Sequence, residues 1–475
     1  MRSNFINALQ TRDARTENDM VTHSTSGNKV LDLFYGMGGS RQMSESAIVD
    51  ILQRAFVEDA LLTTKAMFYN RDVRGGQGER RSFRIMFRWL CENCPEIAVK
   101  NIPNVPFYGR WDDLLLAVDT TVEPVALDYI AHSLQLGDKL CAKWMPREGK
   151  HFNELSKRLR KYMGLSPKDY RKMLAGNTSV VENFMCKNAW GKIDYNHVPS
   201  VASTKYRTAF GKHDHERYAA WLESLSKLES GNKIHADAIF PHSLVNAYIK
   251  DWNYYRNDMG KLDLTVEAQW KALPDYVPDG ASFIPVCDLS GSMTGEPMCV
   301  SASLGIYLSE RNKGPFKDAY ITFSARPSLQ VVTGTLRDRL IGMKLGSIAE
   351  NTNLEAVFKL ILSKAVDALL SAEDMPQTIL IISDMQFDHC TENRSNTAMD
   401  MIKDQYGKAG YDMPNIIFWN VRTSSGVPVK MGENGVALVS GFSPSVMKNL
   451  LSGEITPERI MLKTLLDARY ERVVI

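Results

Sequence analysis

The chain has 475 residues, 44% hydrophobic and 24% charged, which is the composition of an ordinary globular protein of two or three domains. Lys and Arg (57) nearly balance Asp and Glu (55), which excludes a polycation, so any anion-binding surface must come from local clustering. The seven cysteines follow no disulfide framework, and the sequence contains neither a signal-like apolar N-terminus nor a long apolar run. We therefore expect a cytoplasmic (intracellular) chain with reduced thiols and no membrane segment.

The first half of the chain has a helical pattern. Apolar residues recur at spacings of three and four from about Ser44 to Trp270. Short loops with Gly or Pro interrupt the pattern, for example at 75–78 and 164–167. Many helices with short breaks predict an α-helical repeat (HEAT-like) or bundle domain over residues 1–275.

The most distinctive stretch of this half is Tyr69-Asn-Arg-Asp-Val-Arg-Gly-Gly-Gln-Gly-Glu-Arg-Arg81. Its three glycines open a helix and are flanked by arginines, and free backbone N–H groups at a helix start attract anions. The Gly-Lys-Ser/Thr of a nucleotide P-loop is missing. Two interpretations stay open: an anion-binding loop, or a helix–helix turn whose arginines pair with Asp72 and Glu79.

A basic strip lies between residues 143 and 172. Ten Lys or Arg stand there against three Asp or Glu, a local net charge of +7, with Tyr162 and Tyr170 interleaved. Such a strip suits contact with a phosphate backbone, although a charge run is commonly a solvated helix face. The RNA-binding candidates from this strip and from the preceding loop are Arg71, Arg74, Arg80, Lys157, Arg158, Arg160, Lys161, Arg171 and Lys172.

The pattern changes near Pro274–Gly280, where short β-branched and apolar runs begin to alternate with helical stretches. This alternation predicts an α/β doubly wound, largely parallel sheet over residues 280–475, with ligands at the carboxyl ends of the strands. The expected strands are Phe283–Cys287, Ala319–Phe323, Thr378–Ser383, Ile416–Val421 and Val436–Val439, and the expected helices are Pro297–Arg311, Leu354–Leu370, Arg394–Gly407 and Pro444–Leu451.

A candidate metal site follows the first expected strand. Asp288 ends that strand, and Ser290 and Ser292 add two hydroxyls on the same tight loop. Asp384 ends a later apolar strand, so both carboxylates should reach one rim, and Thr352 lies between them in a polar turn that opens a helix. Such oxygen ligands suit Mg²⁺, and their low charge leaves the ion able to accept a partner's carboxylate or phosphate. The alternative is a strand-to-helix turn with capping hydroxyls.

The loop from Asp288 to Ser292, together with Thr352 and Asp384, resembles the metal-ion-dependent adhesion site of von Willebrand factor A domains. The resemblance covers about residues 280–475 and implies a Rossmann-like domain that binds Mg²⁺ (or Mn²⁺) and uses it to engage ligands. The two polar residues before Thr352 depart from the glycines that many members carry. Because the spacing supports no catalytic Ser-His-Asp or Cys-His set, we expect no enzyme and no catalytic residues.

The 71–80 stretch is one of a series of motifs in the first half. The others are Glu17-Asn18 with Thr22, Leu31-Asp-Leu-Phe34, Gly109-Arg-Trp-Asp-Asp-Leu114, Asp194-Tyr195 through Val198-Pro-Ser200, Tyr206 to Phe210 and Phe240-Pro-His242. Their order resembles the Ro ribonucleoprotein family, in which a ring of helical repeats (the TROVE module) is joined to a von Willebrand A domain. The resemblance spans nearly the whole chain and is closer still to an uncharacterised branch of that architecture.

This resemblance implies an RNA-binding protein. Ro proteins bind structured or misfolded non-coding RNA on the outer helical surface and pass single-stranded ends through the central hole. The expected partners are therefore such RNAs, together with a protein that presents an acidic group to the metal site. The alternative is a metal-dependent protein–protein interaction scaffold without RNA binding.

Overall fold

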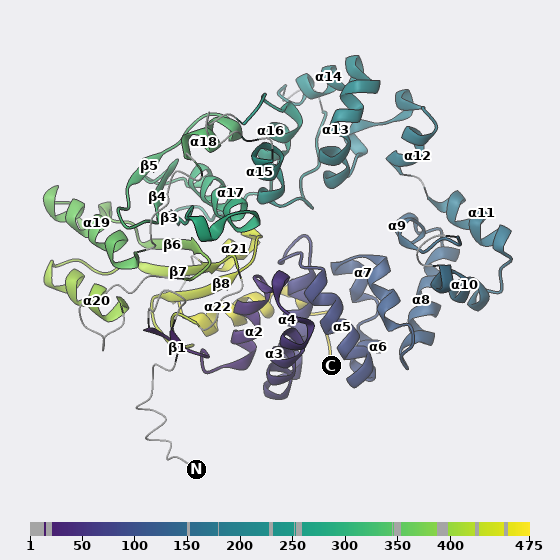
Figure 1. Ribbon diagram of the computed structural model, residues 1–475, viewed down its shortest axis with the longest axis horizontal. Helices are drawn as coiled ribbons and strands as arrows, with labels where there is room; N and C mark the ends of the chain where they lie inside the picture. The colour runs from purple at the N-terminus through teal and green to yellow at the C-terminus, as the bar shows by residue number, and fades with distance from the viewer. Residues whose placement is uncertain are drawn as a thin grey trace, which may run out of the picture. The chain divides into compact units, whose positions relative to one another are not determined.

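The apolar runs of the second half form one six-stranded sheet in the order β5-β4-β3-β6-β7-β8 (Figure 1). All neighbouring strands are parallel except β4 and β5, which are antiparallel. In chain order this is the 3-2-1-4-5-6 arrangement of doubly wound α/β folds, and the predicted α/β sheet is confirmed. The strands are β3 (Phe283–Cys287), β4 (Ala319–Thr322), β5 (Leu329–Val331), β6 (Thr378–Ser383), β7 (Asn415–Asn420) and β8 (Val436–Ser440).

The structure is a computed structural model. It describes residues 14–15, 21–149, 153–178, 180–227, 231–250, 252, 259–343, 345, 353–386, 398–422, 427–450 and 455–475. The chain forms two compact units. We call Met1–Met43 with Ile239–Thr464 the sheet unit, and Ser44–Ala238 with Leu465–Ile475 the helical unit.

Strands β3 and β6 lie side by side at the centre of the sheet. Every residue of both strands is buried, which explains their continuous apolar runs. Phe283 pairs with Thr378 and Cys287 with Ile382, so the residues that follow the two strands meet at one edge. The strand order reverses between β3 and β6, and ligands in doubly wound folds bind at the carboxyl ends of strands at such a point.

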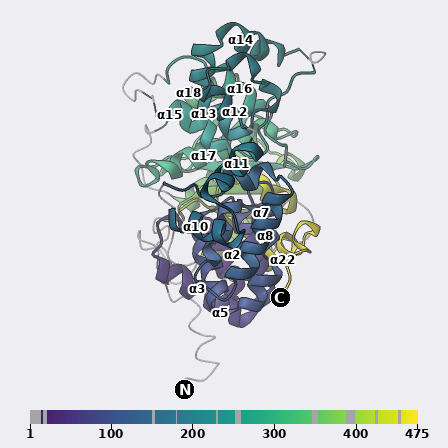
Figure 2. The ribbon, with the colours of Figure 1, turned by 90° about the vertical axis from the view of Figure 1, so that its right-hand side faces the viewer.

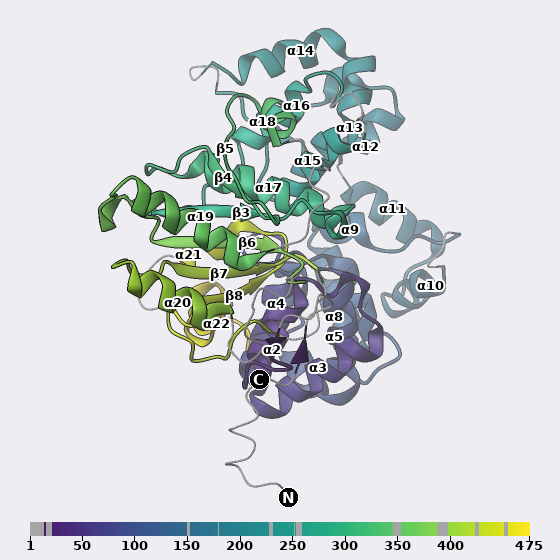
Figure 3. The same ribbon diagram turned by 60° about the vertical axis from the view of Figure 1, so that its left-hand side comes forward.

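Helices cover both faces of this sheet (Figure 3). The helices α19 (Leu354–Asp367) and α20 (Ala398–Lys408) share one apolar core with alternate strand residues. The helix α17 (Glu296–Arg311) packs on the opposite face, where a β-carbon added at Gly305 would lie 2.2 Å from Cys287 Sγ. This close approach requires a glycine and seats α17 directly against β3.

Further elements complete the sheet unit. Helix α2 packs against β8, and His23 exchanges backbone hydrogen bonds with Val427 in the segment between β7 and β8. Strand β5 and helices α18 and α22 were not predicted from the sequence. The elements are β1 (Ala14–Arg15), β2 (Val21–Thr22), α2 (Lys29–Met37), α15 (Pro241–Ile249), α16 (Leu264–Lys271), α18 (Leu336–Met343), α21 (Met447–Leu450) and α22 (Pro457–Leu465).

Among the described residues, no helix has the length and apolar character needed to cross a membrane.

The helical unit consists of helices that pack mainly on near neighbours in the sequence, as α10 and α11 do beside α8 (Figure 2). The predicted helical character of the first half is confirmed, and a HEAT-like repeat stays a prediction. The α-helices are α3 (Glu45–Glu58), α4 (Ala60–Arg71), α5 (Arg81–Asn93), α6 (Pro95–Lys100), α7 (Asn104–Tyr108), α8 (Glu123–Gln135), α9 (Lys139–Trp144), α10 (Asn153–Tyr162), α11 (Pro167–Asn177), α12 (Val181–Cys186), α13 (Ser200–His213) and α14 (His215–Ser224).

The last residues of the chain also belong to the helical unit. The Tyr470 ring stacks on Tyr108 with 5.5 Å between centroids, and Asn101 Nδ2 donates to the Val474 carbonyl at 2.6 Å. The compact units therefore differ in extent from the predicted division into 1–275 and 280–475. Residues 239–275 lie with the sheet, and the chain's end lies with the helices. The division into a domain over 1–275 and a domain over 280–475 therefore stays a prediction.

Candidate functional site

The two predicted aspartate ligands lie at the same edge of the sheet. Asp288 follows β3, Asp384 follows β6, and both are almost fully buried, at 0% and 2% exposure. Ser383 Oγ donates to Asp288 Oδ2 at 2.7 Å, which ties the ends of the two strands together. The parallel register of β3 and β6 thus brings together residues that are far apart in the sequence.

The Asp288 loop, residues 288–292, gathers three oxygen atoms. Ser290 donates to Asp288 Oδ1 through both its Oγ (2.6 Å) and its backbone N–H (3.0 Å). The hydroxyls of Ser290 and Ser292 lie 3.0 Å apart. Because the Asp288 carboxylate accepts from both the hydroxyl and the backbone N–H of Ser290, the turn is capped by Asp288 and its oxygens are held close together.

These donors fit a small divalent cation. Carboxylate and hydroxyl oxygens are hard ligands, and at Mg–O distances of about 2.0–2.1 Å the neighbouring corners of an octahedron are roughly 2.9 Å apart. The 2.6 and 3.0 Å separations between loop oxygens are close to that spacing. Asp288, Ser290, Ser292 and Asp384 are the described residues that would hold the ion. Thr352, the fifth predicted ligand, lies outside the described residues.

The Asp288 carboxyl has an unusual environment. Its pKa is raised to about 6, chiefly by burial and in part by the nearby charge of Asp384, while hydrogen bonds from Ser290 and Ser383 oppose the rise. Two buried carboxylates close together favour a bound cation, because a cation offsets both the desolvation and the mutual repulsion. Within the described part of the chain, no group of three or more His, Cys, Asp or Glu residues is placed to hold a metal ion, so a site at this edge would rest on two carboxylates and on hydroxyl oxygens.

Arg422 stands beside this edge and was not predicted. It follows β7, and its Nη1 donates to the Ser292 carbonyl at 2.8 Å and lies 3.8 Å from Asp384 Oδ2. One guanidinium group therefore spans the Asp288 loop and the end of β6. The sequence did offer one signal for Arg422, which is its position directly after the expected strand Ile416–Val421. The direction of its side chain could not be predicted from that position.

We expect Arg422→Gln to raise the affinity of the chain for Mg²⁺ by about threefold to tenfold, because it removes a positive charge that opposes the cation. Isothermal titration calorimetry with Mg²⁺ measures the change. The matched control is Lys364→Gln, which removes an exposed charge from α19 and should leave the affinity unchanged. Equal affinity in native and Arg422→Gln proteins would show that the guanidinium does not act on the site.

Three arginines of the 69–81 stretch are engaged in ion pairs. Arg71 is 2% exposed and pairs with Asp113 at 2.9 Å, while Arg80 pairs with Asp112 at 2.6 Å. Burial lowers the pKa of Arg71, and Asp113 opposes that shift. Because its guanidinium is enclosed, Arg71 is left out of the proposed RNA-binding surface. Arg74 lies 3.7 Å from Asp237.

Three of the six RNA-binding candidates in the basic strip are also paired. Lys157 contacts Glu154 at 2.8 Å, and Arg160 contacts Glu148 at 2.7 Å. Arg158 bridges Asp119 and Glu123 at 2.7 and 2.9 Å. These contacts agree with the alternative of a solvated, salt-bridged helix face for α10.

Four exposed cations on α10 and α11 remain outside such pairs. No ion pair joins Lys161, Lys168, Arg171 or Lys172 to another residue in the described part of the chain, although Arg171 Nε donates to the Pro167 carbonyl. The whole helical unit holds 31 Lys and Arg against 26 Asp and Glu, a net charge of +5, whereas the sheet unit holds 26 against 29, a net charge of −3. The positive charge of the chain is thus concentrated in the helical unit.

The glycines of the 69–81 stretch serve close packing. Asp72 accepts hydrogen bonds from Arg469 and from Tyr470 Oη (3.0 Å), which anchors the chain's last residues. A β-carbon at Gly75 would lie 2.6 Å from Arg469 Nε, and one at Gly76 would lie 2.0 Å from the Tyr69 carbonyl. The helix–helix turn left open by the sequence is therefore what the structure shows, with partners that sequence spacing did not indicate.

Two family profiles and one viral protein are similar to this chain. The profile described as "Domain of unknown function (DUF2828)" matches residues 16–122 and 130–282, and "Domain of unknown function (DUF7788)" matches residues 282–468. The chain is also similar to "Uncharacterized protein L728" of Acanthamoeba polyphaga mimivirus. The two are 30% identical over an alignment 507 residues long, which covers 95% of this chain and 86% of that protein. These names state no activity.

Proposed function

Because this chain belongs to the DUF2828 family, whose description assigns no activity, we propose a function from the edge of its sheet: the sheet unit is a recognition domain that binds Mg²⁺ or Mn²⁺ and thereby engages an acidic group on a protein partner. The proposed ligands are Asp288, Ser290, Ser292, Thr352 and Asp384.

The observation that carries this proposal is the meeting of the Asp288 loop with Asp384 at the point where the strand order reverses. The doubly wound order also supports the resemblance to von Willebrand A domains. Recognition is favoured over catalysis because the described residues at this edge are ligand-type oxygens and one arginine. They do not form a nucleophile paired with a general base.

Each residue at the edge has a role in this proposal. Asp288 is held in place by Ser290 and Ser383, so its carboxylate is oriented before any ion arrives. A bound divalent cation supplies positive charge and an open position for an oxygen ligand. Arg422 is placed to meet the second oxygen of an incoming carboxylate once Asp384 is otherwise neutralised.

A peptide-display selection tests this function. A random heptapeptide library is applied to the immobilised full chain in Mg²⁺ and eluted with EDTA. We expect the eluted peptides to share an Asp or Glu whose replacement by Asn or Gln lowers binding at least about tenfold, as the loss of a charged ligand should. Peptides that stay bound in EDTA, or that tolerate the amide replacement, would contradict the proposal.

A second candidate function is RNA binding by the helical unit. It is favoured by the concentration of positive charge in that unit and by the exposed cations of α10 and α11, namely Lys161, Lys168, Arg171 and Lys172. Donors of this kind contact phosphate groups without reading sequence. In this proposal RNA, either structured non-coding or single-stranded, contacts that surface, as the resemblance to Ro proteins implies.

We expect replacement of these four residues by Glu to weaken binding of single-stranded RNA and to make the slope of log K against log salt shallower by about 3, because four phosphate contacts are lost. Fluorescence anisotropy with a labelled oligonucleotide measures both quantities. The control reverses four other exposed lysines of the same unit, Lys187, Lys205, Lys212 and Lys233. Equal losses in the two variants, or no salt-dependent binding by the native chain, would contradict RNA binding at this surface.

A further inference from the structure

A cavity of about 710 Å³ opens in the sheet unit at the end of the sheet opposite to the Asp288 loop. It lies where α16 and α17 end and the segment leading to β4 begins, and Asn312 on its wall donates to the carbonyl of Phe283, the first residue of β3. Small-ligand sites commonly have volumes of roughly 300–1,000 Å³. The lining residues are Lys271, Leu273, Asp275, Glu310, Arg311, Asn312, Lys313, Lys317, Asp318 and Arg339.

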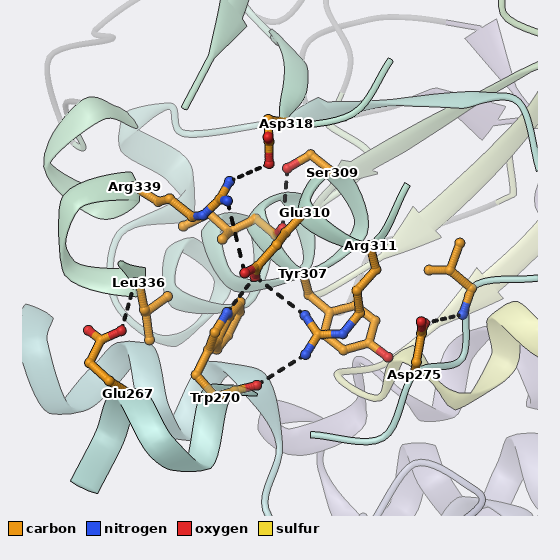
Figure 4. Close-up of polar contacts among 12 residues, drawn as sticks. Glu267, Trp270, Asp275, Tyr307, Ser309, Glu310, Arg311, Asp318, Leu336 and Arg339 are labelled. Carbon is orange, nitrogen blue, oxygen red and sulfur yellow. Dashed lines mark hydrogen bonds and ion pairs between the residues drawn. The ribbon is translucent and has the colours of Figure 1, made fainter. Parts of the chain in front are cut away.

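The wall of this cavity is built around one carboxylate, Glu310. Figure 4 shows it between two guanidinium groups, those of Arg311 (3.5 Å) and Arg339 (3.9 Å). The indole Nε1 of Trp270 donates to the same carboxylate at 2.6 Å. Glu310 is therefore paired with two cations and hydrogen-bonded to an indole within the wall.

The two arginines are held rigidly. Arg311 lies over the Tyr307 ring, 4.1 Å from its centroid, and donates to the Trp270 carbonyl at 3.0 Å (Figure 4). Arg339 donates to Asp318 at 2.8 Å and to the Val332 carbonyl at 2.6 Å. Their side chains are only 11% and 7% exposed, so the positive wall is pre-organised.

Two lysines of the lining have no such partners. In the described part of the chain no ion pair involves Lys271 or Lys317, and both are exposed, whereas Lys313 pairs with Asp279. Across the lining five Lys or Arg stand against three Asp or Glu, a net charge of +2. All three acids are engaged, since Asp275 accepts from the Val277 backbone N–H at 3.0 Å. The cavity thus offers surplus donors and positive charge.

We propose that this cavity binds a small ligand carrying a di- or triphosphate group, with Lys271 and Lys317 contacting the phosphates against the rigid arginine wall. Phosphate fits because it supplies several charged acceptor oxygens to a site whose own acids already have partners. An apolar or cationic ligand would leave the lysine donors without partners. The C-terminal end of α17 adds some negative potential, which Arg311 in the last turn of that helix offsets.

Titration calorimetry of the full chain with inorganic tripolyphosphate, without divalent metal, tests the proposal independently of the metal site. We expect one saturable site, weakened at least about tenfold by the double variant Lys271→Ala/Lys317→Ala and by added salt, as for a charge-assisted contact. Both lysines are exposed, so the variant should melt at the native temperature.

The matched control is Lys364→Ala/Lys408→Ala, which removes two exposed lysines of the same unit outside the cavity. It should bind tripolyphosphate within about twofold of the native chain, because distant exposed charges are screened. Equal weakening in the two double variants would show non-specific attraction and overturn the proposal. Absence of saturable binding by the native chain would overturn it as well.

Discussion

Replacing Asp113 by alanine is expected to lower the free energy of unfolding of the helical unit by about 3–5 kcal/mol, the cost of leaving a buried charge without its partner. Asp113 is fully buried and accepts from Arg71 Nε at 2.9 Å and from Arg80 Nε at 3.3 Å. Its loss strands the enclosed Arg71 guanidinium, whose charge cannot reach water.

Denaturant unfolding, with hydrogen exchange of α4 and α5 to assign the transition to this unit, measures the effect. The control is Asp50→Ala, which breaks a surface pair with Arg54 at 2.8 Å and should cost less than about 0.5 kcal/mol. A similar small cost for both variants would mean that Arg71 is not dependent on Asp113 for its burial.

Replacing Asp288 by alanine is expected to lower the affinity for Mn²⁺ at least about 100-fold, because the change removes a charged ligand rather than a residue that merely supports one. The fold should be retained, since burial raises the carboxyl pKa and thus disfavours the ionised form that the change removes. Depletion of the free Mn²⁺ signal in electron paramagnetic resonance gives the affinity.

Asp367→Ala is the control for this prediction, because Asp367 is an exposed acid of the same unit at the end of α19. Its affinity for Mn²⁺ should equal that of the native chain. If Asp288→Ala bound Mn²⁺ as well as this control does, the Asp288 loop would be an ordinary strand-to-helix turn with capping hydroxyls.

The sheet and its functional edge were readable from the sequence because local rules determine them. The run Thr378–Ser383 is apolar at its four central positions, as expected for a strand buried on both faces, and the structure confirms its bounds. Parallel strands bring their carboxyl ends to one rim, so Asp288 and Asp384 could be placed together without knowledge of side-chain positions.

Elements that depend on tertiary context were missed. Strand β5 has only three residues, of which Leu329 and Val331 are exposed, so no apolar alternation marks it. The start of helix α18 is stabilised by a residue far away in the sequence, because Glu267 accepts a hydrogen bond from the Leu336 backbone N–H at 2.9 Å. Arg422 acquires its importance only through contacts with loops that lie far away in the chain.

The basic motifs of the first half were the hardest to interpret from the sequence, because the sequence does not show which arginines form ion pairs with distant acids. Arg71 and Asp113 come from two separate motifs, which prove to be partners of each other. Gly109 belongs to the same junction, since a β-carbon there would lie 2.7 Å from Arg71 Nε. Motifs that suggested a ligand-binding loop thus also have a structural explanation, which shifts the RNA proposal to α10 and α11.

The most direct test of the central claim is anomalous X-ray scattering from crystals of the full chain grown with Mn²⁺. We expect a manganese peak bound by oxygens of Asp288, Ser290 and Ser292 at about 2.0–2.2 Å, with Asp384 on the same ion directly or through water. Thr352 should complete the same coordination sphere. A peak elsewhere in the chain with none at the Asp288 loop, or no peak under saturating Mn²⁺, would contradict the account.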